Sequence, residues 1–309
     1  MFTMMHIISD ENIDVILAYN PGFGIPTVIG SKLTGTPFIY HIYDYSSAFV
    51  SNIIMKLVVK LHFVVLIRYA ESVWCITEPF LELASSYGAQ KTELMVLGMD
   101  TAEFRVDGSQ VDVDTTAQAP DGGKSIIFIG MIRDKFKIDE FITNSLVDIV
   151  EEYPDLTFYV VGGFHMDRSV IKNAIDAVGL HDNVVLTGFV EREMLIDHLH
   201  EADVGISPTP PSNFSKYNIQ MKVLEYMAAG LPCVSFDLPG AKSVVGHDNG
   251  VKFVETYQEM TEQVVTLLDD PESAAEAGTA AREFAETTFE WDAIIEDREE
   301  SIRQVAGER

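Results

Sequence analysis

Short runs of consecutive apolar residues alternate, from residue 122 onward, with stretches whose apolar positions recur at helical spacing. The runs predict strands at Ser125–Gly130, Thr157–Gly162, Val184–Gly188, Asp203–Ser207, Pro232–Phe236 and Val251–Val254. The stretches predict helices near Asp139–Tyr153, Asp167–Val178, Arg192–Glu201, Ile219–Ala229 and Tyr257–Leu268. Strands that are apolar on both faces are typical of a parallel sheet covered by helices, so we predict an α/β fold.

The first hundred residues repeat this alternation less completely. Apolar runs predict strands at Val15–Tyr19, Pro37–Ile42, Val73–Ile76 and Leu94–Leu97. Residues 109–123 are rich in Asp, Thr, Gly and Pro and have no periodicity, which is typical of a linker. A last helix is expected over Phe289–Val305. The chain therefore divides into residues 1–108, the linker 109–123, a second unit at 124–288 and a helical segment at 289–309.

Composition agrees with two α/β domains. Of the 309 residues 47% are hydrophobic, which is enough for two cores. The formal net charge of −27 indicates an acidic shell, and it disfavours nucleic acid as a partner because phosphate binding requires clustered Lys and Arg. Residues 1–105 carry 6 basic and 10 acidic side chains, a net of −4, which leaves −23 to residues 106–309. Salt screens such self-repulsion, so we expect a halophilic, high-salt cytoplasm.

Cysteine usage and the apolar segments indicate a cytoplasmic location. Cys75 and Cys233, the only cysteines, lie in apolar runs and predict neither a disulfide framework nor a metal site. The first residues lack the basic flank and the apolar core of a signal peptide. The longest apolar stretch, Ile53–Ile67, is interrupted by lysines and is shorter than the roughly 20 residues of a membrane span.

The most informative motif is the segment that runs from Lys222 through Glu225 to Gly230, Pro232 and Val234. It predicts a helix that carries Glu225, ends at a glycine cap and leads through proline into a buried strand. Glu225 lies among apolar residues, where an unpaired carboxylate is costly. A structural alternative is an ion pair with Lys222, three positions earlier on the helix.

The string Glu225-Tyr-Met-Ala-Ala-Gly-Leu-Pro-Cys-Val resembles the carboxy-terminal motif of family 4 glycosyltransferases, which share the GT-B fold. Other segments resemble that family in the same order, namely 35–44, 70–78, 98–104, 126–130, 155–163, 183–190 and 202–208. The resemblance implies two Rossmann-like domains, an acceptor-side domain at 1–108 and a nucleotide-sugar-binding domain at 124–288, with 289–309 crossing back toward the first. It also implies sugar transfer with retention from a nucleoside diphosphate sugar to a glycan or lipid-linked acceptor, without cofactor or metal.

The resemblance assigns roles to single residues. Glu225 is expected to hold the ribose hydroxyls of the donor, a role that suits two carboxylate oxygens on a rigid helix. Basic residues after the first strand of the second domain are expected at the diphosphate, where charge develops as the glycosidic bond breaks. The candidates are Arg133, Lys135 and Lys137. The choice among them stays open because Met131 stands where the family commonly has arginine.

Further positions follow from the same resemblance. Tyr217 stands where many members have a second glutamate, and Asn218 and Lys222 resemble a variant element that contacts the sugar or the phosphate. Asp44, at a strand end that faces the cleft in the family, is an acceptor-side candidate. The remaining positions expected at the nucleotide are Gly130, Gly162, Gly163, Gly188, Phe189 and Val190.

Three other motifs are better explained structurally. Asp112 and Asp114 resemble a metal-binding acid pair but lie in the linker, where a solvated role is expected. The segment Pro21–Gly24 lacks the remaining features of a dinucleotide fingerprint and predicts a strand-to-helix turn. His41 on an apolar strand is typical of a core histidine.

The segment 53–68 sets Lys56, Lys60 and Arg68 in an otherwise apolar helix. One interpretation is a buried helix whose long basic side chains extend to the surface. The other is an interfacial helix that docks peripherally on the inner face of a membrane, close to a lipid-linked acceptor. Both stay open at this point.

Members of the family begin with additional strand-helix units before the segment that Met1–Tyr19 resembles. We therefore expect this chain to bind donor but to transfer sugar poorly. The alternative from another class is a non-catalytic nucleotide-sugar-binding or partner subunit. A GT-B epimerase is a weaker third interpretation because paired acid and base carboxylates are lacking.

Overall fold

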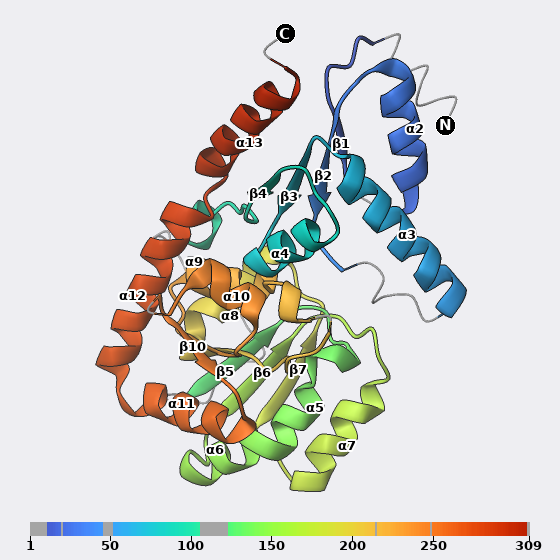
Figure 1. The fold of residues 1–309 in the computed structure, drawn as a ribbon. Coiled ribbons are helices and arrows are strands. Elements are labelled where there is room, and N and C mark those ends of the chain that lie inside the picture. Colours follow the sequence, from blue (N-terminus) through green and yellow to red (C-terminus); the bar gives the residue numbers. More distant parts are fainter. Residues whose placement is uncertain are drawn as a thin grey trace.

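The computed structural model describes residues 11–19, 21–45, 52–105, 123–213, 215–247 and 249–307. Within them the chain forms two parallel β-sheets, each accompanied by helices, with the amino-terminal sheet in the upper half of Figure 1. The predicted α/β class is therefore confirmed. The predicted linker 109–123 lies almost entirely outside the described residues, as do Asp112 and Asp114.

The amino-terminal sheet has the strand order β1-β2-β3-β4. Its strands are β1 (Ile16–Ala18), β2 (Phe38–Ile42), β3 (Ser72–Cys75) and β4 (Thr92–Leu94). Its helical elements are η1 (Pro21–Phe23), α2 (Gly24–Thr34), α3 (Ile53–Tyr69), α4 (Glu78–Ser86) and η3 (Ala102–Phe104). The turn η1 leads from β1 into α2, as predicted for Pro21–Gly24.

The strand predicted at Leu94–Leu97 is wrong, because β4 ends at Leu94. Polar residues begin this strand and conceal it in the hydropathy pattern. Glu93 pairs with Trp74 in the ladder, and its carboxylate accepts hydrogen bonds from the hydroxyls of Ser72 and Ser301. These bonds satisfy a carboxylate that would otherwise be costly beside the core.

The carboxy-terminal sheet has the strand order β10-β9-β8-β5-β6-β7. Its strands are β5 (Ser125–Ile129), β6 (Thr157–Val161), β7 (Val184–Gly188), β8 (Val204–Ser207), β9 (Cys233–Phe236) and β10 (Val251–Val254). The order along the chain changes direction between β5 and β8. At such a switch point the carboxyl ends of the strands leave a crevice for ligands.

The helical elements of this half follow the prediction in most places. They are η4 (Asp134–Phe136), α5 (Ile138–Phe141), the π-turn η5 (Ile142–Leu146), α6 (Val147–Glu152), α7 (Arg168–Val178), α8 (Arg192–Glu201), η6 (Ser215–Tyr217), α9 (Met221–Ala229), α10 (Pro239–Val245), α11 (Tyr257–Asp269), α12 (Pro271–Thr288) and α13 (Trp291–Val305). Helix α12 was not predicted because its buried residues are the small Gly278, Ala281 and Ala285. A Cβ at Gly278 would lie 2.1 Å from the carbonyl oxygen of Gly230, so this glycine permits α12 to pack closely.

Tyr226 fixes α9 against the switch point. Its buried hydroxyl accepts a hydrogen bond from the N–H of Ile129 on β5 (3.1 Å) and donates to the carbonyl of Ile206 on β8 (3.1 Å). Gly205 makes room for the ring, because a Cβ there would lie 2.7 Å from the nearest ring carbon. Burial raises the pKa of Tyr226 well above its usual range, so the hydroxyl remains a donor. The first turns of α9 are therefore placed at the ends of β5 and β8.

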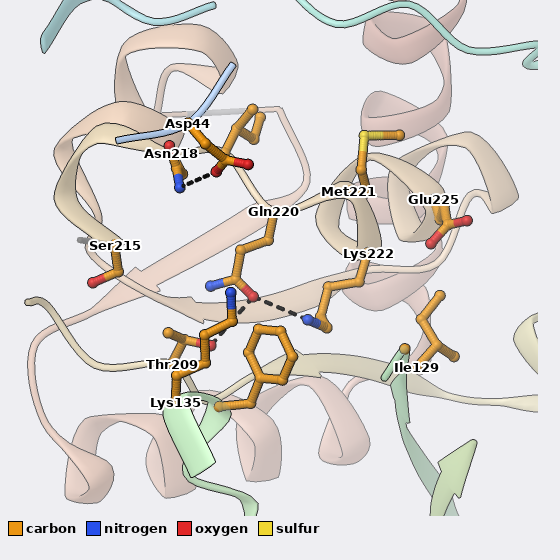
Figure 2. Close-up of a pocket in the computed structure, with 13 residues that line it drawn as sticks. Asp44, Ile129, Lys135, Thr209, Ser215, Asn218, Gln220, Met221, Lys222 and Glu225 are labelled. Atoms are coloured by element: carbon orange, nitrogen blue, oxygen red, sulfur yellow. Dashed lines mark hydrogen bonds between the residues drawn. The ribbon is translucent and has the colours of Figure 1, made fainter. Parts of the chain in front are cut away.

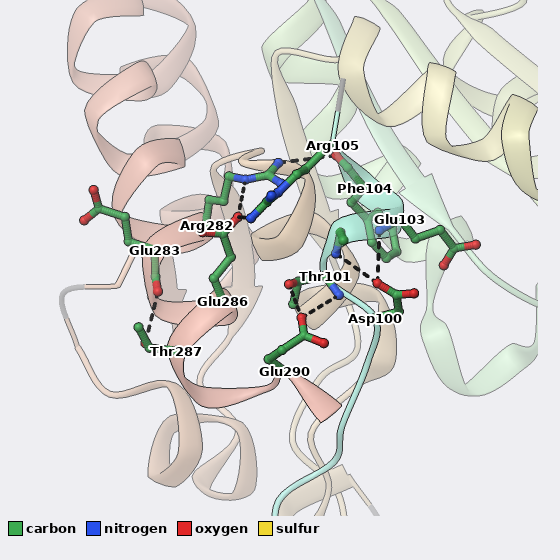
Figure 3. Close-up of polar contacts among 11 residues, drawn as sticks. Asp100, Thr101, Glu103, Phe104, Arg105, Arg282, Glu283, Glu286, Thr287 and Glu290 are labelled. Atoms are coloured by element: carbon green, nitrogen blue, oxygen red, sulfur yellow. Dashed lines mark hydrogen bonds and ion pairs between the residues drawn. The ribbon is translucent and has the colours of Figure 1, made fainter. Parts of the chain in front are cut away.

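The chain crosses between the two sheets at two neighbouring segments, drawn in part in Figure 3. The N–H of Met99 donates to the carbonyl of Phe289 (2.8 Å), and Glu290 accepts from the N–H and the hydroxyl of Thr101. Beyond this crossing α13 lies against the amino-terminal sheet, where the indole N–H of Trp74 donates to the hydroxyl of Ser301 (2.9 Å). The predicted helix at Phe289–Val305 therefore begins at Trp291.

Among the described residues, no helix is long and apolar enough to span a membrane.

Candidate functional site

A pocket opens at the carboxyl ends of β5 and β8, beside the first turns of α9 (Figure 2). Its lining brings together six residues that the sequence singled out, namely Asp44, Gly130, Lys135, Asn218, Lys222 and Glu225. The lining also includes polar residues to which the sequence analysis gave no role, namely Thr209, Ser215 and Gln220. Two separate halves of the chain thus contribute side chains to one cavity.

Lys222 is the most deeply buried charged group of the pocket. Its ammonium donates to the side-chain oxygen of Gln220 (3.1 Å) and lies over the rings of Phe136 (3.9 Å) and Phe128 (4.7 Å). Burial lowers the pKa of Lys222 to about 7, with Lys135 lowering it further and Glu225 opposing the shift. An anion placed in the pocket would restore the charge of this side chain.

Gln220 links the end of β8 to α9. Its side-chain oxygen accepts from the hydroxyls of Ser207 (2.9 Å) and Thr209 (3.2 Å) as well as from Lys222. Its buried amide nitrogen has no hydrogen-bond partner among the described residues. A buried amide without a partner is costly, so the nitrogen is suited to a ligand oxygen. A polar residue between the apolar Ile219 and Met221 was the sequence signal that could have identified it.

Asn218 and Asp44 join the two halves of the pocket. The amide nitrogen of Asn218 donates to the carboxylate of Asp44 (3.0 Å), and its buried amide oxygen has no partner within the described ranges. Burial raises the pKa of Asp44, while Lys135 and this hydrogen bond oppose the increase. Burial, together with nearby Arg133, lowers the pKa of Lys135, and Asp44 opposes that decrease. A carboxylate, an amide and an ammonium therefore meet where the two sheets face each other.

Glu225 is paired, but not with Lys222 as the structural alternative proposed. Arg192, at the start of α8, donates to the Glu225 carboxylate at 2.7 Å. The same guanidinium makes a bidentate contact with Glu103 (3.0 and 2.9 Å) and lies over the ring of Phe104. Sequence analysis missed Arg192 because its partners are 33 and 89 residues away. The bond to Arg192 occupies one oxygen of Glu225 and orients the carboxylate beside the pocket.

The three basic candidates at the end of β5 are not equivalent. Lys135 lines the pocket, whereas the guanidinium of Arg133 contacts the sulfur of Met131 (3.0 and 3.3 Å) outside the lining. Lys137 has a left-handed backbone and forms an ion pair with Glu140 (2.9 Å), which raises its pKa. The structure therefore brings only Lys135 of these three to the described pocket wall.

The glycines beyond β5, β6 and β7 form a tightly packed edge. Gly130 lies over the Lys222 side chain, and a Cβ at Gly162 would lie only 2.0 Å from the carbonyl oxygen of Gly130. The N–H of Gly162 donates to the carbonyl of Gly188 (2.8 Å). Gly163 faces open space. Of the positions predicted at the nucleotide, Gly130 and Glu225 line the pocket, and Gly162, Gly163 and Gly188 do not.

Phe189 and Val190 follow this edge. The Phe189 side chain is 79% exposed, and Val190 is half-buried against the core. Neither contributes to the described pocket wall. The structure therefore gives no contact of these two residues with the pocket.

Two residues have structural roles. Tyr217 stacks on Phe80 (ring centroids 5.2 Å apart), and its carbonyl accepts from the hydroxyl of Thr77 (2.6 Å). His41 is buried in the amino-terminal core as predicted, and burial next to Arg298 lowers its pKa to about 3. The imidazole is therefore neutral at physiological pH.

Solved structures place this architecture in the GT-B fold. The protein matches Anabaena HepE in complex with UDP with a TM-score of 0.80 at 16% identity, covering 98% of this chain and 81% of HepE. It matches the sucrose-phosphate synthase of Thermosynechococcus elongatus with a TM-score of 0.75 at 17% identity, covering 98% and 76%.

Residues 123–270 match the family model described as "Glycosyl transferases group 1". A GDP-mannose-dependent alpha-(1-6)-phosphatidylinositol monomannoside mannosyltransferase of Mycobacterium tuberculosis is 26% identical, over 68% of this chain and 56% of its own length. A phosphatidyl-myo-inositol mannosyltransferase of the same organism is 24% identical over 73% and 60%. The chain thus spans little more than half of these relatives. Residues 123–270 thus resemble group 1 glycosyltransferases, and the chain has the GT-B fold.

Proposed function

We propose that this chain binds a nucleoside diphosphate sugar in the described pocket and transfers the sugar with retention to a glycan or lipid-linked acceptor. The observation that carries the proposal is that Lys222 and Lys135 both line the pocket at the switch point, in a strongly acidic chain. Two cations whose pKa values are both lowered repel each other and are incompletely hydrated. A diphosphate between them would relieve both costs.

The other residues fit parts of the same ligand. Glu225, held by Arg192, presents a carboxylate oxygen to the ribose hydroxyls of the donor. The free amide oxygen of Asn218 is suited to accept from a sugar hydroxyl, and the free amide nitrogen of Gln220 is suited to donate to a sugar or phosphate oxygen. Asp44 reaches the pocket from the amino-terminal sheet, on the side where an acceptor would enter.

Catalysis on this plan requires no protein nucleophile. The bond between the anomeric carbon and the diphosphate oxygen breaks, and the acceptor oxygen bonds to the same face of that carbon. The acceptor proton passes to the departing diphosphate oxygen, and the lysines stabilise the charge that develops there. Configuration at the anomeric carbon is therefore retained.

Calorimetry with a panel that includes UDP, GDP, UDP-glucose and GDP-mannose tests donor binding. We expect Glu225→Ala to weaken the best ligand by about 1.5–3 kcal/mol, because hydrogen bonds to a charged group are lost. Glu193→Ala, an exposed position on the neighbouring helix α8, is the matched control. Unchanged affinity in Glu225→Ala, or absence of binding by every nucleotide in wild-type protein, contradicts the assignment of the pocket.

The stereochemical outcome is tested on product. Proton NMR of a freshly formed glycoside should show the anomeric configuration of the donor, and inversion would contradict the front-face mechanism. Tight donor binding without transfer to any glycan or lipid acceptor would instead favour a non-catalytic nucleotide-sugar-binding subunit.

A further inference from the structure

The first half of α3 is apolar and exposed on all sides. Residues 52–58 are all exposed to solvent, and Ile53, Ile54 and Leu57 are 67%, 68% and 61% exposed. The buried side chains of this helix, Phe63, Leu66 and Ile67, all lie in its second half. The interpretation of segment 53–68 as a buried helix is therefore wrong for its first half, which projects beyond the amino-terminal sheet in Figure 1.

Helix α2, which packs against the second half of α3, carries further exposed apolar side chains. It packs against α3 at Gly24, where a Cβ would lie 2.7 Å from the carbonyl oxygen of His62. Its exposed apolar side chains are Ile25, Ile29 and Leu33, which recur every four residues and so share one face of the helix. We call the exposed apolar residues of both helices, Ile25, Ile29, Leu33, Ile53, Ile54, Met55, Leu57, Val58 and Leu61, the α2/α3 face. Large apolar side chains exposed in this number on two neighbouring helices mark an interaction site.

The charge of the two helices is opposite to that of the protein. Gly24–Thr34 and Ile53–Tyr69 contain no Asp or Glu, although the whole chain has 48 acidic residues among 309. Their charged residues are Lys32, Lys56, Lys60 and Arg68. Lysine and arginine side chains thus accompany the apolar residues on two helices that contain no acidic residue.

We propose that the α2/α3 face docks this protein on an anionic lipid bilayer. Apolar side chains flanked by lysines bind at the headgroup boundary, where the side chains enter the acyl region and the ammonium groups meet lipid phosphates. A symmetric contact with a second copy would bring the like charges of Lys56 and Lys60 together, which disfavours self-association through this face. At physiological salt the Debye length of about 8 Å limits repulsion from the distant acidic surface.

The consequence for the acceptor rests on the proposed transferase function, whereas bilayer binding does not. Tyr45, next to Asp44 of the pocket, contacts the ring of Phe63 on α3 (centroids 6.0 Å apart) and the ring of Tyr217 (5.5 Å). Docking through α3 would therefore bring the pocket entrance close to a lipid-borne acceptor.

Flotation with vesicles tests the proposal without any donor. Vesicles of phosphatidylcholine with 30% phosphatidylglycerol should float the full chain at 0.15 M salt, and pure phosphatidylcholine should float it about tenfold less. The variant Ile54→Ser/Leu57→Ser/Leu61→Ser should lose binding by about tenfold or more, because it removes apolar surface. Its control is Val170→Ser/Met194→Ser/Ile295→Ser, which changes three exposed apolar residues on other helices.

Two charge-reversal variants test the electrostatic contribution to vesicle binding. Lys56→Glu/Lys60→Glu should reduce flotation by about tenfold or more, whereas the exposed pair Lys172→Glu/Lys252→Glu should leave it unchanged. Thermal melting confirms that each variant is folded. Equal flotation of the test and control variants overturns the proposal. The proposal is also overturned if the wild-type protein does not bind vesicles but forms a concentration-dependent dimer that the Ile54/Leu57/Leu61 variant abolishes. Donor binding by these variants, measured by calorimetry, should persist. Loss of membrane docking is thereby distinguished from loss of the proposed donor site.

Discussion

The two halves of the molecule use apolar residues in opposite ways. Around the six-stranded sheet, apolar side chains form one continuous buried cluster, and glycines let helices and strand ends approach within van der Waals contact. Around the four-stranded sheet the buried cluster is smaller, and two helices present large apolar side chains to solvent. On the two proposals above, close packing in the carboxy-terminal half positions a ligand, whereas the amino-terminal half keeps apolar surface for contact with a lipid bilayer.

The largest expected effect is on the unfolding free energy, at one of two adjacent glycines. Gly162→Ala places a Cβ 2.0 Å from the carbonyl oxygen of Gly130 at a backbone φ of +146°, so we expect a loss of about 3 kcal/mol or more in unfolding free energy. Gly163→Ala faces open space and should change stability by less than about 0.5 kcal/mol. Urea unfolding measures both. Similar losses in the two variants would show that close packing at this edge is not what stabilises it.

The next largest expected effect is a loss of donor affinity when Arg192 is replaced. Arg192→Met removes the contact that orients Glu225, and we expect donor affinity to fall roughly tenfold, or about 1.4 kcal/mol. Glu103→Gln leaves the Arg192–Glu225 bond in place and should reduce affinity less than threefold, by about 0.6 kcal/mol. Calorimetry on both variants distinguishes a positioning role from a purely structural ion pair. Equal effects, or none, would exclude the positioning role.

The pH dependence of donor binding tests Lys222. Its pKa of about 7 in the folded protein, against 10.5 ordinarily, means that the free protein loses this proton above pH 7. Donor affinity should then fall by up to about tenfold per pH unit above pH 7, with proton uptake on binding. Lys222→Met should bind weakly and without this slope. Calorimetry in buffers of different ionisation enthalpy measures the uptake, and an unchanged slope in Lys222→Met would assign it to another group.

The titration of Lys222 affects folding stability in the opposite direction from donor affinity. Between pH 7 and 10.5 the unfolded chain binds the proton that the folded chain has released. The unfolding free energy contributed by Lys222 therefore rises with pH across that window. Stability measured from pH 7 to 9 should increase less in Lys222→Met than in wild-type protein.

Salt is expected to change the stability of the strongly acidic part of the chain. Residues 106–309 carry a net charge of −23, so screening by potassium chloride should stabilise the protein by ~1–2 kcal/mol, or about 2–8 °C in melting temperature. Sucrose of equal osmolality strengthens apolar burial but does not screen charge, and it is the control. Equal shifts in the two solutes would show that self-repulsion is not what limits stability.

Strands and helices with large apolar residues could be predicted from the sequence, because burial on both faces leaves a continuous pattern. Thus β5, β6, β7 and α8 lie where the pattern placed them. The polar strand β4 and the alanine-rich α12 could not be predicted, since Glu93 is satisfied by hydroxyls from distant segments and α12 packs through Gly278 and Ala281. Patterns of hydropathy report side-chain size and polarity, and close packing of small residues leaves little trace in them.

The candidate site was predictable where residues are close in sequence. Asn218, Lys222 and Glu225 share one segment of the pocket lining, and Lys135 follows the first strand of the domain. The contacts of Arg192 with Glu225 and Glu103 join three segments that only the folded chain brings together. The outward exposure of α3 could not be predicted either, because an apolar helix has the same pattern whether another surface covers it or not.

The neighbouring crossings of the chain have a mechanical consequence. Met99 bonds to Phe289, and Gly98 lets the ring of Trp291 approach to within 2.5 Å of where a Cβ would be, so the described segments that lead from one sheet to the other lie against each other. The two halves also touch at a second place, where Thr77 donates to the carbonyl of Tyr217, the N–H of Glu78 donates to the hydroxyl of Ser243, and Asn218 donates to Asp44. A rotation of one half about the crossing would separate these three pairs, so the pocket can open only if these hydrogen bonds break.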